Sequence, residues 1–143
     1  MGHILLYIIQ YVKEQNTVQQ HSFRSPLTPS IARYMMVNMI GEALKGHLDL
    51  LLLSVLSTGP AHGYAIIETL RARSEGMFDL PEGTIYPALH RLENQGLLKS
   101  NWSEDTGRRK RVYQLTPKGQ EALNTRQDEW LKFSKAVNAT VGI

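Results

Sequence analysis

The sequence contains no cysteine among its 143 residues. This absence excludes a disulfide scaffold, a thiolate metal site and a cysteine nucleophile. Long apolar runs are also lacking, since the longest, Ile4 to Ile9, is far shorter than the roughly 20 residues that cross a bilayer. With 42% apolar and 20% charged residues, we expect one folded core and no membrane contact.

The residue patterns of enzymes are missing as well. No nucleophile elbow, phosphate-binding glycine loop or pair of carboxylates in a cleft can be identified. The chain has five histidines, and no two of them stand at the i, i+4 spacing with which a helix binds a metal. They are His3, His21, His47, His62 and His90. We therefore expect no catalytic site, no metal and no cofactor.

Positive charge is sparse overall but concentrated in one stretch. The net charge is +3, and the segment from Lys99 to Lys118 alone carries six basic and two acidic residues. The rest of the chain is therefore slightly acidic. A local cationic segment of this kind indicates an anionic partner.

The chain divides into three expected parts: residues 1–45 as an N-terminal extension, 46–116 as the main domain and 117–143 as a terminal helix. In the extension an apolar opening precedes a polar stretch, Lys13 to Ser30, whose prolines indicate an irregular linker. The opening can be a short strand, a docking helix or a translated upstream segment, since Met35, Met36 and Met39 offer later starts.

Helical periodicity predicts one helix up to Leu56 and a second from about His62 to Ser74. A third is expected to begin near Gly83 or Thr84, because Pro87 is tolerated only in about the first turn, and to end before Gly96.

The pattern then changes from helical to extended. Leu97 to Ser103 and Lys110 to Leu115 read as two strands of a hairpin, and Thr116-Pro117 as the start of a last helix. The fold class is therefore mainly α with a small β-hairpin, a winged helix-turn-helix with a C-terminal helix.

The third helix is the candidate DNA-recognition helix. Its apolar face leaves an outer face on which four residues can reach bases and phosphates, namely Thr84, Tyr86, His90 and Arg91. A merely solvated face is the alternative.

The hairpin favours DNA, because Arg108, Arg109, Lys110 and Arg111 follow Gly107 at the tip of a ribbon. A solubilising charge run, or an anchor for RNA or acidic lipid, is the alternative. Trp102 and Tyr113 are expected to form a cross-strand aromatic cluster and to pack in the core.

The last helix carries an apolar seam made of Leu123, Trp130, Phe133 and Val137. This seam predicts a twofold homodimer that matches a pseudo-palindromic site, and packing onto the first helix is the alternative. Trp130 can also line a cavity for a planar apolar effector, or serve the interface alone.

A resemblance to the PadR family of transcriptional regulators is carried by three strings over roughly residues 46–123, LDLLLLSVLSTGPAHGYAI, EGTIYPALHRLENQGLL and GRRKRVYQLTPKG. It implies a cytoplasmic, homodimeric winged-helix repressor that a small molecule or another signal releases from its operator. It also implies DNA contact or shaping by Tyr64, Tyr86, Arg91 and Gly107 to Arg111, a bracing role for Glu93 and a ligand-lining role for Trp130. A winged-helix module that binds protein is the rival interpretation.

Overall fold

The computed structural model describes residues 29–104 and 107–143, with the backbone alone at residues 29, 30, 32–34, 36 and 37. The chain divides into two compact units, residues 1–44 and 45–143. Helix α2 (Pro29–Leu44) is the described part of the first unit and has proline at its first position, where no N–H is needed. The predicted linker thus ends two residues early, and its remainder and the apolar opening lie outside the described residues.

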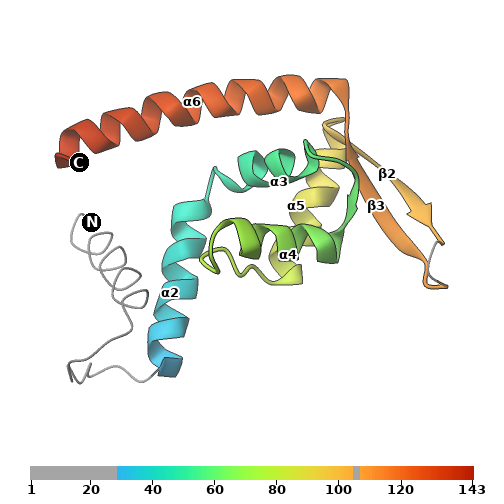
Figure 1. Ribbon diagram of the computed structural model, residues 1–143, viewed down its shortest axis with the longest axis horizontal. Coiled ribbons are helices and arrows are strands. Elements are labelled where there is room, and N and C mark those ends of the chain that lie inside the picture. The colour runs from blue at the N-terminus through green and yellow to red at the C-terminus, as the bar shows by residue number, and fades with distance from the viewer. Residues whose placement is uncertain (1–28, 105–106) are drawn as a thin grey trace. The chain divides into compact units, whose positions relative to one another are not determined.

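The larger unit begins with three helices, α3 (Leu48–Leu56), α4 (Gly63–Arg73) and α5 (Glu82–Asn94) (Figure 1). Their apolar faces form one core with the sheet. The residues that are almost completely buried are Leu52, Leu53, Ile66, Ile85, Leu89, Leu92, Leu98 and Leu123. The three helices predicted from periodicity are therefore confirmed.

Helix α5 begins at Glu82, slightly before the predicted start. The reason is that Thr84 N and Ile85 N both donate to the carbonyl of Pro81, at 2.9 and 3.2 Å. Pro87 therefore lies inside the helix, where it cannot donate to the carbonyl of Gly83. Gly83 is exposed, so water can reach that carbonyl and the helix tolerates the proline.

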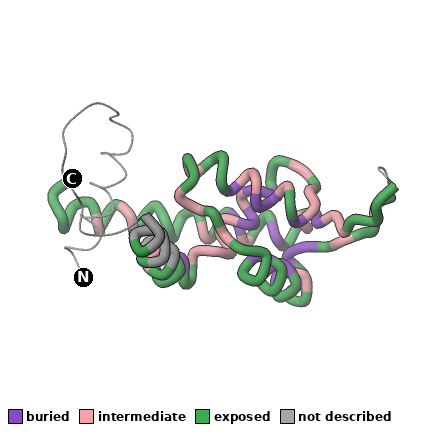
Figure 2. The backbone as a smooth tube through the Cα atoms, turned by 90° about the horizontal axis from the view of Figure 1, so that it is seen from below, coloured by how far each residue is buried: buried purple, intermediate pink, exposed green. Residues whose placement is uncertain are grey.

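A three-stranded antiparallel sheet follows the order β1-β3-β2, with β1 (Ala61–His62), β2 (Leu98–Ser103) and β3 (Lys110–Leu115). Strand β1 pairs with Tyr113 and Val112 and was not predicted, because two residues are too few to show alternation. The β2–β3 hairpin, here called the wing, projects from the helices (Figure 1), and its far end is exposed (Figure 2). The expected fold class is confirmed.

The last helix, α6 (Pro117–Val141), starts where the sequence predicts. Thr116 Oγ1 accepts from Gly119 N at 3.0 Å and donates to Gly96 O at 2.7 Å, so one hydroxyl caps α6 and ties it to the end of α5. Gly119 is buried against the start of the wing. No helix in the described residues is long and apolar enough to cross a membrane.

Gly119→Ala should lower the free energy of unfolding by about 2–3 kcal/mol, because its Cβ would overlap the carbonyl oxygen of Leu97 and crowd Leu115. Urea unfolding followed by circular dichroism measures this loss. Gln120→Ala, at the exposed neighbouring position, is the matched control and should change stability little. A Gly119→Ala protein as stable as its parent would contradict the close approach of α6.

Candidate nucleic-acid interface

Helix α5 presents a mixed polar and aromatic face to solvent. Ile85, Ala88, Leu89 and Leu92 are buried, which leaves the opposite face free. The four predicted contact residues are all exposed on that face, and they are Thr84, Tyr86, His90 and Arg91. The sequence thus placed the outer face of this helix correctly, while the role of these side chains stays a prediction.

Tyr86 rests on the first turn of α4. A Cβ at Gly63 would lie 2.5 Å from the Tyr86 hydroxyl oxygen and 2.6 Å from two ring carbons, so a larger residue there would force the ring to move. Tyr86 nevertheless stays 39% exposed, and Tyr64, the next residue of α4, is 60% exposed. The contact between Gly63 and Tyr86 was not predicted, because periodicity does not indicate which residues of two helices touch.

The start of α4 depends on a histidine. His62 Nδ1 accepts from Ala65 N at 3.2 Å and so caps the helix, which requires that this nitrogen carries no proton.

In the described part of the chain, no three residues among histidine, aspartate and glutamate come together as a metal site.

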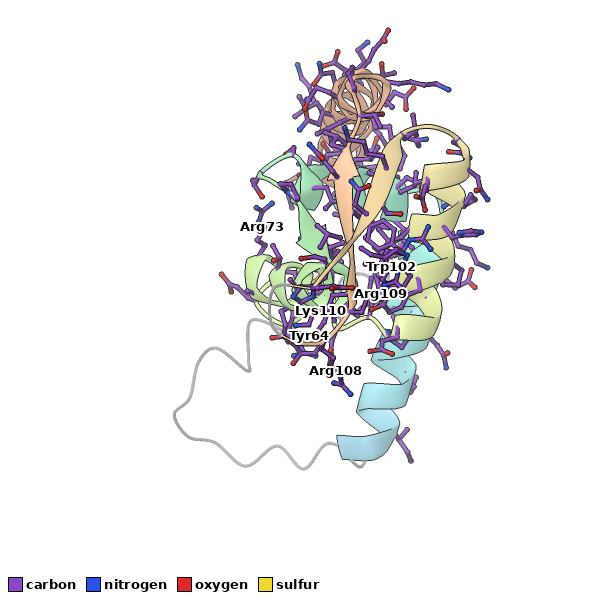
Figure 3. The ribbon with its side chains drawn as sticks, turned by 90° about the vertical axis from the view of Figure 1, so that its right-hand side faces the viewer. Tyr64, Arg73, Trp102, Arg108, Arg109 and Lys110 are labelled. Carbon is purple, nitrogen blue, oxygen red and sulfur yellow. The ribbon has the colours of Figure 1, made fainter. Side chains whose placement is uncertain are left out.

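Three cations extend from the end of the wing. Arg108, Arg109 and Lys110 are exposed, and no described carboxylate forms an ion pair with any of them. Gly107 has φ +70° beside them, a conformation that favours glycine in this turn. Figure 3 shows the three side chains at the wing, with Trp102 next to Arg109.

Arg111 is used differently, because it joins the wing to α5. Its guanidinium donates to Glu93 Oε2 and to Ser100 Oγ, both at 2.7 Å, and Ser100 Oγ donates to Glu93 Oε1 at 2.5 Å. The hydrogen bond from Ser100 and the charge of Arg111 hold the pKa of Glu93 below its ordinary value. Glu93 thus braces the fold, as the resemblance implied.

Arg91 is also engaged with protein. It donates to both carboxylate oxygens of Asp49, at 2.9 and 2.5 Å, and Arg126 of α6 lies 3.6 Å from the same carboxylate. Asp49 therefore links α3, α5 and α6. Sequence analysis did not single out Asp49, because an acidic residue in the first turn of a helix is already explained by the helix dipole.

The predicted aromatic cluster of Trp102 and Tyr113 is wrong in part. Tyr113 is buried as expected, at 4% exposure, but Trp102 is 57% exposed and does not belong to the core. Trp102 pairs with Arg111 across the strands, and the guanidinium of Arg109 lies 4.7 Å from the centre of its ring. A cation rather than an aromatic ring is therefore the neighbour of Trp102.

The apolar seam of α6 separates into two parts. Leu123 belongs to the core of its own chain at 2% exposure, which corrects its assignment to a dimer interface. Trp130 and Phe133 are 42% and 55% exposed, and Val137 is half-buried. The predicted interface thus begins one turn or more beyond Leu123.

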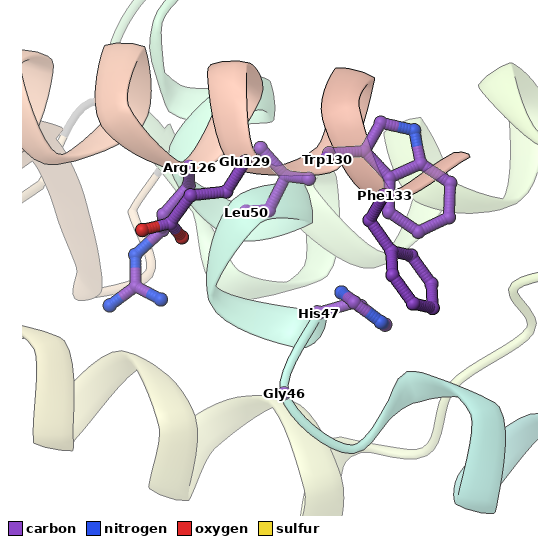
Figure 4. Close-up of a pocket in the computed structure, with 7 residues that line it drawn as sticks. All are labelled: Gly46, His47, Leu50, Arg126, Glu129, Trp130 and Phe133. Carbon is purple, nitrogen blue, oxygen red and sulfur yellow. The ribbon is translucent and has the colours of Figure 1, made fainter. Parts of the chain in front are cut away.

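A pocket of about 140 Å³ lies beside Trp130, between the start of α3 and the middle of α6 (Figure 4). The ring of His47 meets that of Trp130 edge-on, with centroids 5.0 Å apart, and Phe133 lies 6.0 Å from Trp130. Arg126 and Glu129 line its polar side. The pocket therefore offers aromatic walls together with one cation and one anion.

The lowered pKa of Glu93 predicts that the protein loses stability in acid. Because its folded pKa lies below the ordinary 4.5, its contribution is complete above that value and is lost as the pH falls through the folded pKa. The advantage of the wild type over Glu93→Gln in free energy of unfolding should therefore shrink as the pH is lowered from about 6 to 3. Urea unfolding at several pH values measures it, and a difference that stays constant would contradict the charged bridge.

Comparison with known proteins identifies the arrangement. The transcriptional regulator PadR-like family matches residues 52–125, just over half of the chain. The transcriptional regulator Rv3488 of Mycobacterium tuberculosis is 56% identical over 41 residues, 29% of this chain and 38% of that protein. The transcriptional regulator YqjI of Escherichia coli is 31% identical over 94 residues, 66% of this chain and 44% of that protein. The chain thus spans less than half the length of either regulator.

Solved structures of regulators resemble about two thirds of this chain. A PadR family transcription regulator from Clostridium difficile has a TM-score of 0.60 at 37% identity, covering 66% of this chain and 98% of that one. A transcriptional regulator from Clostridium thermocellum has a TM-score of 0.64 at 32% identity, covering 68% and 96%. With its winged fold and the family match over residues 52–125, the chain belongs to the PadR-like family, whose members are transcriptional regulators and not enzymes.

Proposed function

We propose that this protein is a sequence-specific DNA-binding repressor that acts in the cytoplasm as a homodimer and is released by a small molecule. The observation that carries this proposal is the pairing of two surfaces. One is the exposed polar and aromatic face of α5, and the other is the end of the wing, where three cations have no described carboxylate partner.

Helix α5 is the element that reads sequence. Thr84, Tyr86 and His90 can donate and accept hydrogen bonds or pack on base edges, and they lie on the face that a major groove would meet. Arg91 directs two donors to Asp49, so we assign it the task of fixing α5 rather than that of reading bases. Tyr64 is exposed at the start of α4, and we propose that it contacts the phosphate backbone.

The wing supplies affinity. Arg108, Arg109 and Lys110 are long, exposed cations that can replace the counterions of phosphates or enter a narrow minor groove. Arg111 is bound to Glu93, and we assign it the task of holding the wing, as we assign Gly107 that of turning it.

Two chains are needed for a twofold operator. The half of α6 beyond Leu123 exposes Trp130, Phe133 and Val141. Exposure of several apolar side chains along one helix is unfavourable in water and is typical of an interaction surface. We propose that Trp130, Phe133 and Val137 meet the same residues of a second chain, and that the dimer binds a pseudo-palindromic site.

Fluorescence anisotropy on the DNA upstream of the protein's own coding region, against scrambled DNA, tests the DNA-binding proposal. Binding to that fragment should be tighter by about 10³-fold or more and should saturate at two chains per site. Arg108→Ala with Arg109→Ala should weaken binding to both DNAs alike and reduce the slope of log K against log salt by about two, because two phosphates are no longer neutralised.

The charge-matched control is Lys132→Ala with Lys135→Ala, which removes two exposed cations from α6 instead. It should leave the salt slope unchanged. A wing variant with the slope of the wild type would remove the main support for the proposal. Failure of the wild type to bind either DNA at low salt, together with a stable complex with another protein in a pull-down, would favour the protein-binding module.

Effector release is supported by the pocket beside Trp130. Arg126 lines that pocket and also approaches Asp49, the carboxylate that holds Arg91 on the recognition helix. A planar ligand seated on Trp130 that displaces Arg126 would therefore change the surroundings of Asp49 and, through it, the position of α5. This route is short and consists of side chains in contact.

A neutral coumarin, a neutral flavone and naphthol are suitable planar probes. At least one should quench tryptophan emission in the wild type but not in Trp130→Leu, weaken DNA binding, and relieve repression of transcription in vitro. Arg126→Ala should keep the quenching and lose most of the effect on DNA affinity. No quenching by any probe would count against planar effectors, and full release in Arg126→Ala would refute the route through Asp49.

A further inference from the structure

Trp102 has no role in the fold that would explain its exposure. It lies on β2 near the end of the wing with 57% of its surface accessible, and it does not belong to the buried core. More than half of this large apolar side chain is therefore available for burial against a partner, which would be favourable. Apart from the guanidinium of Arg109, the described chain leaves this surface of the ring open to an external partner.

The neighbour of Trp102 points to the partner. The guanidinium carbon of Arg109 lies 4.7 Å from the centre of the indole ring. Stacking on an aromatic ring uses the flat face of a guanidinium and leaves its N–H donors, which lie in the plane, free for an anion. This distinguishes Arg109 from Arg91, which donates twice to Asp49, and from Arg111, which donates to Ser100 and Glu93.

The register of the hairpin fixes which side of the wing carries this pair. Trp102 is opposite Arg111 and Ser100 is opposite Tyr113, so their side chains share one face of the ribbon. Ser100 and Arg111 bond to Glu93, so this face is turned toward α5. Along it, burial decreases from Leu98 through Ser100 to Trp102. A DNA backbone held against α5 would therefore meet Trp102 and Arg109 first on the wing.

We propose that Trp102 and Arg109 act as one DNA-contacting unit, in which the indole fixes the guanidinium toward a phosphate and packs its own exposed surface against the sugar of the same strand. Trp102 is thus a positioning residue for Arg109 and also a direct contact. The inference rests on the proposed function, because it names the part of the DNA that this face of the wing recognises. Phosphate supplies the anion, and deoxyribose supplies the apolar surface.

A double-mutant cycle on DNA affinity tests the unit, using wild type, Trp102→Ala, Arg109→Ala and the double variant on the upstream fragment. Trp102→Ala should weaken binding about two- to fivefold, the range expected of a cation–π contact, and Trp102→Phe should restore part of the loss. The double variant should bind more tightly than the product of the two single losses predicts, because the two residues act together.

Two further measurements separate contact from structure. DNA should quench the tryptophan emission of the wild type more than that of Trp102→Phe, which keeps Trp130 as its only tryptophan. The melting temperature of Trp102→Ala should match that of the wild type, because the side chain is exposed. Lys99→Ala, an exposed cation on the other face of β2, is the control and should reduce affinity less than Arg109→Ala.

The outcomes are distinct. If the wild type binds the fragment but Trp102→Ala binds equally well, or if the two single losses simply multiply, the unit is refuted while the DNA-binding proposal stands. If the wild type shows no salt-dependent binding at all, both fall together.

Discussion

One carboxylate joins the recognition helix and the wing, the two elements of the proposed DNA-binding surface. Glu93, in the last turn of α5, receives hydrogen bonds from β2 through Ser100 and from β3 through Arg111. The core beneath is apolar and could tolerate small rotations of the wing, because dispersion and burial have no direction. Charge-assisted hydrogen bonds do have direction, so this bridge fixes the angle between helix and wing. Helix α5 and the cationic wing are thereby held together as one surface, which the proposed function assigns to DNA.

Arginine performs two different tasks in this protein, and the neighbouring residues decide which. Arg91 and Arg111 are held by carboxylates that are only 14% and 21% exposed, and such pairs serve to orient helices and strands. Arg108 and Arg109 have no described carboxylate beside them and remain ready for an external anion. The modest net charge of the chain therefore says little about partners, whereas the distribution of acidic residues around each arginine says a great deal.

The elements of the larger unit other than β1 could be predicted from sequence because each carries its own local signal. Periodicity indicates α3 to α5, alternation indicates the wing, and Thr116-Pro117 indicates the start of α6. The sequence predicted which face of α5 is exposed. It did not predict which side chains from different elements contact one another. Asp49 and Arg91 are 42 positions apart, and no local pattern relates them. Trp102 was misplaced for the same reason, since its sequence neighbours do not show where the core ends.

The absence of a side chain at Gly63 has a consequence for engineering. The Tyr86 ring occupies the space that any larger residue at position 63 would need, so the two positions cannot vary independently. A library that randomises α5 alone would vary position 86 while position 63 stays glycine. Most replacements of Tyr86 are smaller and would leave a gap over the first turn of α4. Redesign of this surface should therefore change positions 63 and 86 together, pairing a smaller residue on α5 with alanine or serine on α4. Alanine or serine would also reduce the conformational freedom of the unfolded chain at position 63.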